Sequence, residues 1–166
     1  QFLEKTGTDM ERIRQELEKL ICYCMEKESI TEEDVAVICS EQTENKIFDM
    51  INAMAEKKQK KAMELYYDLL ALKEPPMRIL YLITRQFNLL MQVKELSEEG
   101  YSAKTISERL KMAGFIVRNC LRQAEYFSLK TLKEALQDCV RMEEAVKTGR
   151  MNDVMSVELL LVKYSS

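Results

Sequence analysis

Apolar residues recur every three or four positions along most of this 166-residue chain, which is the period of an amphipathic α-helix. Short polar, glycine-containing or proline-containing segments separate the stretches that follow the pattern. The pattern predicts helices over about residues 9–26, 32–39, 47–55, 60–72, 76–99, 103–110, 115–127, 129–147 and 153–163. Because most of the chain follows this period, the sequence predicts an all-α fold.

The helix that follows Pro75 and Pro76 has two apolar stripes instead of one. The first stripe consists of Leu80, Ile83, Phe87 and Leu90, and the second of Ile79, Leu82, Leu89, Val93 and Leu96. A helix that is apolar on two faces packs between neighbours, so we expect it at the centre of a bundle. Ser102 and Ser128 are predicted to cap the helices that follow them.

The last helix is too apolar for a solvated surface, because Val157 and Leu159 to Val162 cover more than one face of it. Such a segment is either buried in its own domain or packed against a partner. The pattern alone leaves both alternatives open.

Composition supports a helical, folded chain and excludes several kinds of chemistry. Four Gly and two Pro are few for this length, and 46% hydrophobic with 32% charged residues is typical of a folded protein. The absence of His excludes Ser-His and Cys-His catalysis and His-ligated zinc. The five cysteines lack a ligand-like spacing, so we interpret them as reduced thiols of an intracellular, cytoplasmic protein. No catalytic residue, metal ligand, cofactor site or phosphate-binding loop is expected, and no apolar run approaches the roughly 20 residues that cross a membrane.

Two features bear on nucleic acid, although the formal net charge is −3. The first is a basic run of Lys57, Lys58, Lys60 and Lys61 at a junction between helices. We favour a solvated junction next to a helix C-terminus, and keep a weak contact with DNA as the alternative.

The second feature is residues 102–122, which imitate a helix-turn-helix with Gly114 at the turn. A DNA-binding regulator would read bases with polar side chains of the second helix, and only Arg118, Asn119, Arg122 and Gln123 are available there. A helix pair packed into a bundle explains the same pattern, and we keep the regulator as the competing functional class. A generic helical adaptor is a third, weaker alternative.

The order of several short motifs resembles the delta subunit family of the bacterial DNA polymerase III clamp loader. The motifs are residues 16–20 (ELEKL), 30–35 (ITEEDV), Ile47-Phe48 with Ala53, 85–87 (RQF), 124–128 (AEYFS), and 147–149 (KTG) followed by Asp153 and 159–161 (LLL). They extend over essentially the whole chain. One departure is Gly114, where the family pattern has a proline.

The resemblance implies an AAA+-like subunit that does not hydrolyse ATP. By it, residues 1–40 are the C-terminal part of the lid domain and residues 41–166 are the helical collar, or oligomerisation, domain. The collar would join this subunit to the motor and delta-prime subunits. An N-terminal domain outside this chain would contact the sliding clamp, with DNA bound indirectly through the complex and no membrane involved. A start at Gln1, without Met, is consistent with part of a longer protein.

The resemblance also bears on the last helix, because it places that helix in the collar. Part of the helix is then expected to support contact between subunits. Val157, Leu160 and Leu161 are the candidate interface residues.

Overall fold

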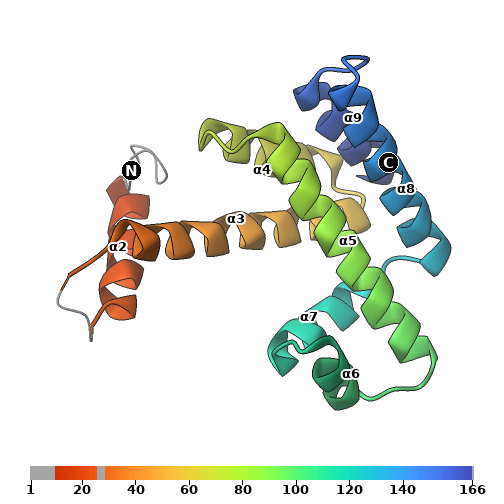
Figure 1. Ribbon diagram of the computed structural model, residues 1–166, viewed down its shortest axis with the longest axis horizontal. Helices are drawn as coiled ribbons and strands as arrows, with labels where there is room; N and C mark the ends of the chain where they lie inside the picture. Colours follow the sequence, from red (N-terminus) through yellow and green to blue (C-terminus); the bar gives the residue numbers. More distant parts are fainter. Residues whose placement is uncertain (1–9, 26–28, 166) are drawn as a thin grey trace.

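The computed structural model describes residues 10–25 and 29–165, and these form α-helices without any strand. The helices pack into a bundle from which one long helix extends to the N-terminal helix (Figure 1). In chain order they are α2 (Met10–Tyr23), α3 (Glu32–Ala55), α4 (Gln59–Ala71), α5 (Pro76–Glu98), α6 (Ala103–Leu110), α7 (Gly114–Ala124), α8 (Leu129–Lys147) and α9 (Asp153–Ser165). The predicted all-α fold is confirmed.

Helix α5 lies at the centre of the bundle, as its two apolar stripes predict. It packs against α3, α6, α7, α8 and α9. Pro75 is the extended N-cap residue and Pro76 opens the first turn, where a missing N–H costs nothing. Both stripes are buried except for Leu89 and Leu96, which are partly exposed.

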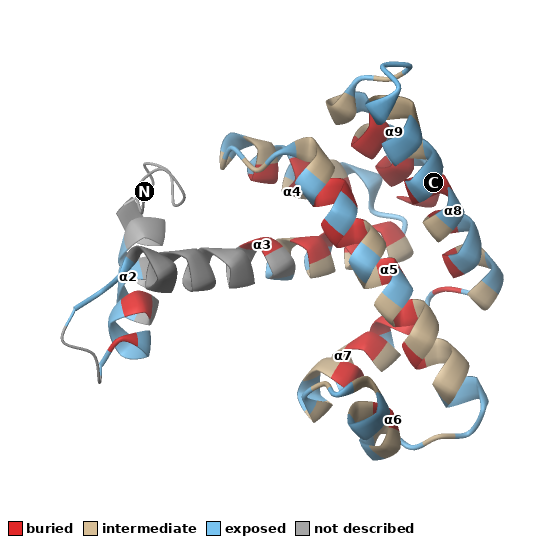
Figure 2. Cartoon of the chain, viewed as in Figure 1, coloured by how far each residue is buried: buried red, intermediate tan, exposed pale blue. Residues whose placement is uncertain are grey.

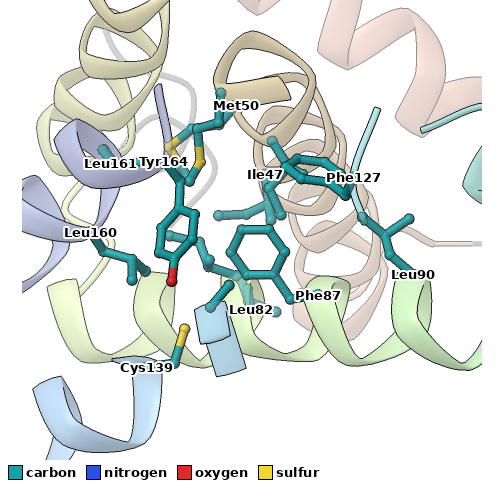
Figure 3. Close-up of a cluster of buried hydrophobic side chains, with 14 of the residues drawn as sticks. Ile47, Met50, Leu82, Phe87, Leu90, Phe127, Cys139, Leu160, Leu161 and Tyr164 are labelled. Atoms are coloured by element: carbon teal, nitrogen blue, oxygen red, sulfur yellow. The ribbon is translucent and has the colours of Figure 1, made fainter. Parts of the chain in front are cut away.

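The core joins the central helix to both ends of the bundle. The Phe87 ring meets Phe127 edge-on, with centroids 5.9 Å apart, and lies 6.0 Å from the Tyr164 ring (Figure 3). Edge-to-face pairs of this kind stabilise a core beyond their buried area. The buried residues form red stripes on the facing sides of α4, α5, α8 and α9 (Figure 2).

Both predicted serine caps are present. The Ser102 Oγ accepts a hydrogen bond from the Thr105 N–H at 3.2 Å, and the Ser128 Oγ accepts one from the Thr131 N–H at 3.0 Å. Each serine satisfies a donor that the first turn of a helix leaves free. These two caps fix where α6 and α8 begin.

Several helices end in a left-handed residue, and lysine often takes the place of glycine there. The residues with positive φ are Lys57, Lys73, Lys111, Gly100 and Gly149. At the end of α4 the Lys73 N–H bonds the Leu70 carbonyl at 2.8 Å, and the next N–H bonds the Leu69 carbonyl at 3.1 Å. This pair of bonds is the Schellman motif, which glycine normally completes without strain. Lysine at these ends is one reason why the chain needs so few glycines.

Helix α3 departs from the sequence prediction. Two short helices, over 32–39 and 47–55, were expected with a polar connection between them, but a single helix runs through the whole segment. The segment contains no Gly or Pro, and its Glu, Gln, Thr and Asn residues are compatible with a helix. The predicted boundary at residue 40 therefore falls within a helix rather than in a loop.

Helix α2 packs against α3 and completes the N-terminal end of the described chain. Leu20 and Cys24 of its predicted apolar stripe are buried, whereas Leu17 of the same stripe is 40% exposed. The side chains of 32–42 that would face it lie outside the described residues.

Candidate functional site

The three residues predicted as a subunit interface are core residues. Val157, Leu160 and Leu161 of α9 have no exposed surface, and the latter two point into the core beside Tyr164 (Figure 3). Their spacing places them on the face of α9 that packs against α3, α4, α5 and α8. A neighbouring subunit cannot contact these side chains, so the prediction is wrong for these residues.

A different stripe of α9 is apolar and exposed. Met155, Leu159 and Val162 are 52%, 43% and 38% exposed and lie four and three residues apart, on one face of the helix. We call these three residues the α9 stripe. Tyr67 of α4 is half exposed next to this helix, and its hydroxyl donates to the Glu158 carboxylate at 2.7 Å. The α9 stripe and Tyr67 therefore form an apolar surface that is exposed to solvent in the isolated chain.

A buried carboxylate fixes α9 against α8. Asp138 of α8 accepts hydrogen bonds from the Tyr164 hydroxyl at 2.6 Å and the Lys163 ammonium at 2.5 Å, and forms a longer pair with Arg141 at 3.4 Å. Burial alone would raise the pKa of Asp138, but these hydrogen bonds and positive charges outweigh it and lower the pKa. Burial and the bond to Asp138 raise the pKa of Tyr164 in turn. The network therefore holds α9 in one orientation and keeps Asp138 ionised.

The basic run lies at the turn between α3 and α4. Lys57 is the left-handed residue that ends α3, and its ammonium donates to the Tyr164 carbonyl at 3.5 Å. Lys58 pairs with Glu56 at 2.7 Å, and Lys60 lies 3.9 Å from Glu64. These contacts agree with a solvated helix junction. Contact of Lys57, Lys58, Lys60 and Lys61 with DNA stays a prediction.

Helices α6 and α7 pack as the predicted pair, but one of the four side chains proposed to read bases is in the core. Gln123 is 1% exposed and links three helices. Its Nε2 donates to the Phe48 carbonyl at 3.0 Å and to Asn52 Oδ1 at 2.7 Å, and its Oε1 accepts from Gln86 Nε2 at 2.7 Å. The structure therefore removes Gln123 from any DNA-reading surface.

A cleft opens between α3, α5 and α7. Its volume is about 430 Å³. The described residues that line it are Asn45, Ile47, Phe48, Leu82, Arg85, Gln86, Leu89, Met112, Phe115, Ile116, Asn119 and Cys120. Most of these side chains are apolar.

The thiols with described side chains are mostly small core residues. Cys24, Cys120 and Cys139 are buried and Cys22 is exposed, and none of the four forms a disulfide. Burial raises the pKa of the Cys139 thiol to about 11, and burial also raises the pKa of Cys120. Among described residues, no group of three Cys, Asp or Glu side chains could hold a metal ion. No helix in the described ranges is both long and apolar enough to cross a membrane.

Residues 44–164 match the family model described as the DNA polymerase III delta subunit, C-terminal domain. The chain belongs to this family. The match covers α4 to α8, most of α9 and the second half of α3, and so includes both the α9 stripe and the cleft. It confirms the resemblance drawn from the ordered motifs.

Two curated relatives and one solved structure agree with the family. The chain is 34% identical over 151 residues to the DNA polymerase III subunit delta of Bacillus subtilis, covering 91% of this chain and 44% of that protein. It is 27% identical over 100 residues to the probable DNA polymerase III subunit delta of Aquifex aeolicus, covering 60% of this chain and 29% of that protein. A solved structure of the Bacillus subtilis DNA clamp loader delta protein superposes with a TM-score of 0.74 and 31% identity, covering 99% of this chain and 48% of that one. The chain thus spans less than half the length of these relatives.

Proposed function

We propose that this chain forms the C-terminal assembly part of a clamp-loader delta subunit. Residues 41–166 would be the helical collar domain, and residues 1–40 the last part of the preceding lid domain. The family match from residue 44 onward to a C-terminal domain supports this division. Because α3 runs through residue 40, the two parts would be joined by one helix rather than by a linker.

The observation that carries the proposal is the exposed apolar stripe on α9. Obligate interfaces resemble a core cut in half, so a subunit that assembles must keep apolar surface exposed when alone. The α9 stripe and Tyr67 supply such a surface, and the Asp138 network holds its helix in place. We propose that this surface contacts the motor or delta-prime subunits during assembly of the loader.

The test is to place a charge in the α9 stripe. Leu159→Asp leaves the core untouched, because Leu159 is 43% exposed and faces away from Leu160 and Leu161. A carboxylate buried unpaired in an interface is strongly unfavourable, so we expect at least about a tenfold loss of affinity. The full-length subunit is mixed with its motor and delta-prime partners, and the complex is measured by size exclusion with light scattering.

Val140→Asp is the matched control. Val140 is an apolar residue of α8 that is 60% exposed and lies outside the stripe. We expect this variant to assemble like the parent, and both variants to keep the parent helicity and melting temperature. Equal assembly by the two variants would place the interface on another surface.

The chain's own contribution would be structural and not catalytic, in an intracellular complex that loads the sliding clamp for DNA replication. No His is available, and the sequence has no phosphate-binding loop. We expect calorimetry with ATP and magnesium to give no saturable binding to this chain. A micromolar one-to-one isotherm would contradict a purely structural role.

A further inference from the structure

The cleft between α3, α5 and α7 combines an apolar interior with specific polar groups. Eight of its described lining residues are apolar, among them the Phe48 and Phe115 rings. Arg85 is the one charged member of that set, and Asn45 and Asn119 add amide groups. A volume of about 430 Å³ is within the usual range of ligand sites, which are mostly apolar with a few polar groups that fix orientation.

Positive charge is concentrated in the α6–α7 segment, whose second helix forms one wall of this cleft. Residues 102–122 carry five basic side chains and one acidic one, Glu108, although the whole chain is net negative. The five are Lys104, Arg109, Lys111, Arg118 and Arg122, and we call them the α6–α7 cations. All five are exposed, and none forms an ion pair with a described acidic side chain. Elsewhere in the described chain, exposed lysines such as Lys130 and Lys133 lie within 4 Å of a glutamate.

The cations and the cleft share helix α7. Phe115, Arg118 and Arg122 lie three and four residues apart and so follow one stripe of the helix. The Arg122 guanidinium donates to the side-chain oxygen of Asn119, which lines the cleft. Phe115 is 61% exposed at the cleft mouth. A molecule seated in the cleft would therefore lie next to the Arg122 guanidinium, which forms no ion pair with a described acidic side chain.

We propose that the cleft is a docking site for an acidic peptide segment that carries one or two bulky apolar side chains. The apolar side chains fill the hollow between Phe48 and Phe115, and flanking carboxylates face Arg118 and Arg122. Single-stranded DNA also suits basic and aromatic side chains, but it binds along an open groove that tracks its backbone. Here the cations of α7 lie beside a hollow lined mostly by apolar side chains instead of along a basic groove, which favours a peptide. This proposal does not depend on the α9 stripe, and its failure would leave the assembly role intact.

The experiment begins with an unbiased selection. A phage-displayed library of random twelve-residue peptides is panned on the whole chain at low salt, and bound clones are sequenced. We expect enrichment of Asp and Glu around Phe, Leu, Ile or Met. The consensus peptide is then labelled with fluorescein and titrated by anisotropy, and its affinity should fall as salt rises, because exposed charges are screened.

Two variants test the two parts of the site. Arg118→Gln with Arg122→Gln should weaken the peptide about fivefold, because two exposed charge pairs are lost, and should flatten the salt dependence. Phe115→Ala should weaken it about tenfold, which is about 1.4 kcal/mol, and leave the salt dependence unchanged, because the change removes an apolar anchor and no charge. Neither change removes a buried side chain, so both variants should melt like the parent.

Matched controls make the same changes elsewhere. Lys130→Gln with Lys133→Gln removes two exposed charges from α8, and Tyr81→Ala removes an aromatic ring of α5 that is 63% exposed. Both controls should bind the peptide within twofold of the parent. Selected peptides without net negative charge, or equal binding by the cleft variants and the controls, would overturn the proposal. A 20-nucleotide oligothymidine that binds more tightly than the peptide, and is weakened by the cleft variants, would show a nucleic-acid surface instead.

Discussion

Gln123 offers a direct test of how α7 is held to the rest of the bundle. Its side-chain amide makes three hydrogen bonds, one each to Phe48 and Asn52 of α3 and to Gln86 of α5. Gln123→Ala removes all three and leaves a space where the amide stood. The variant keeps every backbone hydrogen bond of α7, so the loss reports on contacts between helices.

The expected loss of unfolding free energy depends on whether water can reach the hydrogen-bond partners of Gln123. A typical hydrogen bond within a protein contributes about 1 kcal/mol net, because water replaces the lost partner when it can reach. Asn52 and Gln86 are only partly buried, so water can reach both, and the net value applies rather than the full cost of an unsatisfied group. Three bonds then amount to about 3 kcal/mol. For a chain of this length, that corresponds to a fall in melting temperature of about 6–12 °C.

The measurement is thermal and urea unfolding followed by circular dichroism, with Gln137→Ala as the control. Gln137 is an exposed residue of α8, and its truncation should change stability by less than about 0.5 kcal/mol. The Gln123 variant should show a lower urea midpoint with an unchanged slope. A loss no larger than that of the control would refute the view that this amide joins α7 to α3 and α5.

Two further predictions concern backbone conformation and pH. Gly114→Pro and Lys73→Gly should each raise the free energy of unfolding in urea by about 0.5–1 kcal/mol. Gly114 is the first residue of α7 and follows an extended Ala113, where proline fits, and Lys73 has φ 59°, which glycine adopts without strain. A loss of stability in either variant would contradict the reasoning. Because the native pKa of Asp138 is lowered, its contribution is complete above about pH 4 and is lost as pH falls through that native value. Asp138→Asn should therefore be less stable at pH 7 and lose less stability than the parent below pH 4 in melts across pH; parallel curves would show that Asp138 contributes nothing to the acid sensitivity.

Local signals predicted most of the fold. The cap serines and the Pro-Pro start of α5 act within one turn of helix, so the sequence specifies them directly. The two stripes of α5 predicted its central place because burial on two faces leaves a visible period in the sequence.

The choice of interface residues on α9 was wrong because the helix carries two apolar stripes and the chosen residues belong to the buried one. Val157, Leu160, Leu161 and Tyr164 follow the spacing of a single buried face, whereas Met155, Leu159 and Val162 follow another. The spacing distinguishes the two stripes, but it does not show which stripe packs against the other helices of the chain. That choice depends on where α4, α5 and α8 lie, which is a property of the tertiary fold.

The contacts of Gln123 were missed for a related reason. A glutamine on a helix is usually solvated, and only partners more than 30 residues away in the chain make its burial favourable. The cleft likewise unites residues from 45 to 120, so no local pattern marks it. Charge was the one readable signal, since five basic residues within 102–122 stand out in an acidic chain.

Because α3 is one unbroken helix, the number of residues in it sets the distance and the rotation between α2 and the bundle. Each added residue in a helix advances the chain by about 1.5 Å and turns it by about 100°. Two residues inserted near position 42 would turn everything before them by about 200° relative to the bundle, whereas seven would restore the facing to within about 20° and lengthen the helix by about 10 Å. The orientation of α2 relative to the bundle therefore depends on the length of α3. Insertions of whole helical turns preserve this orientation, and substitutions that keep both the length and the helix preserve it as well.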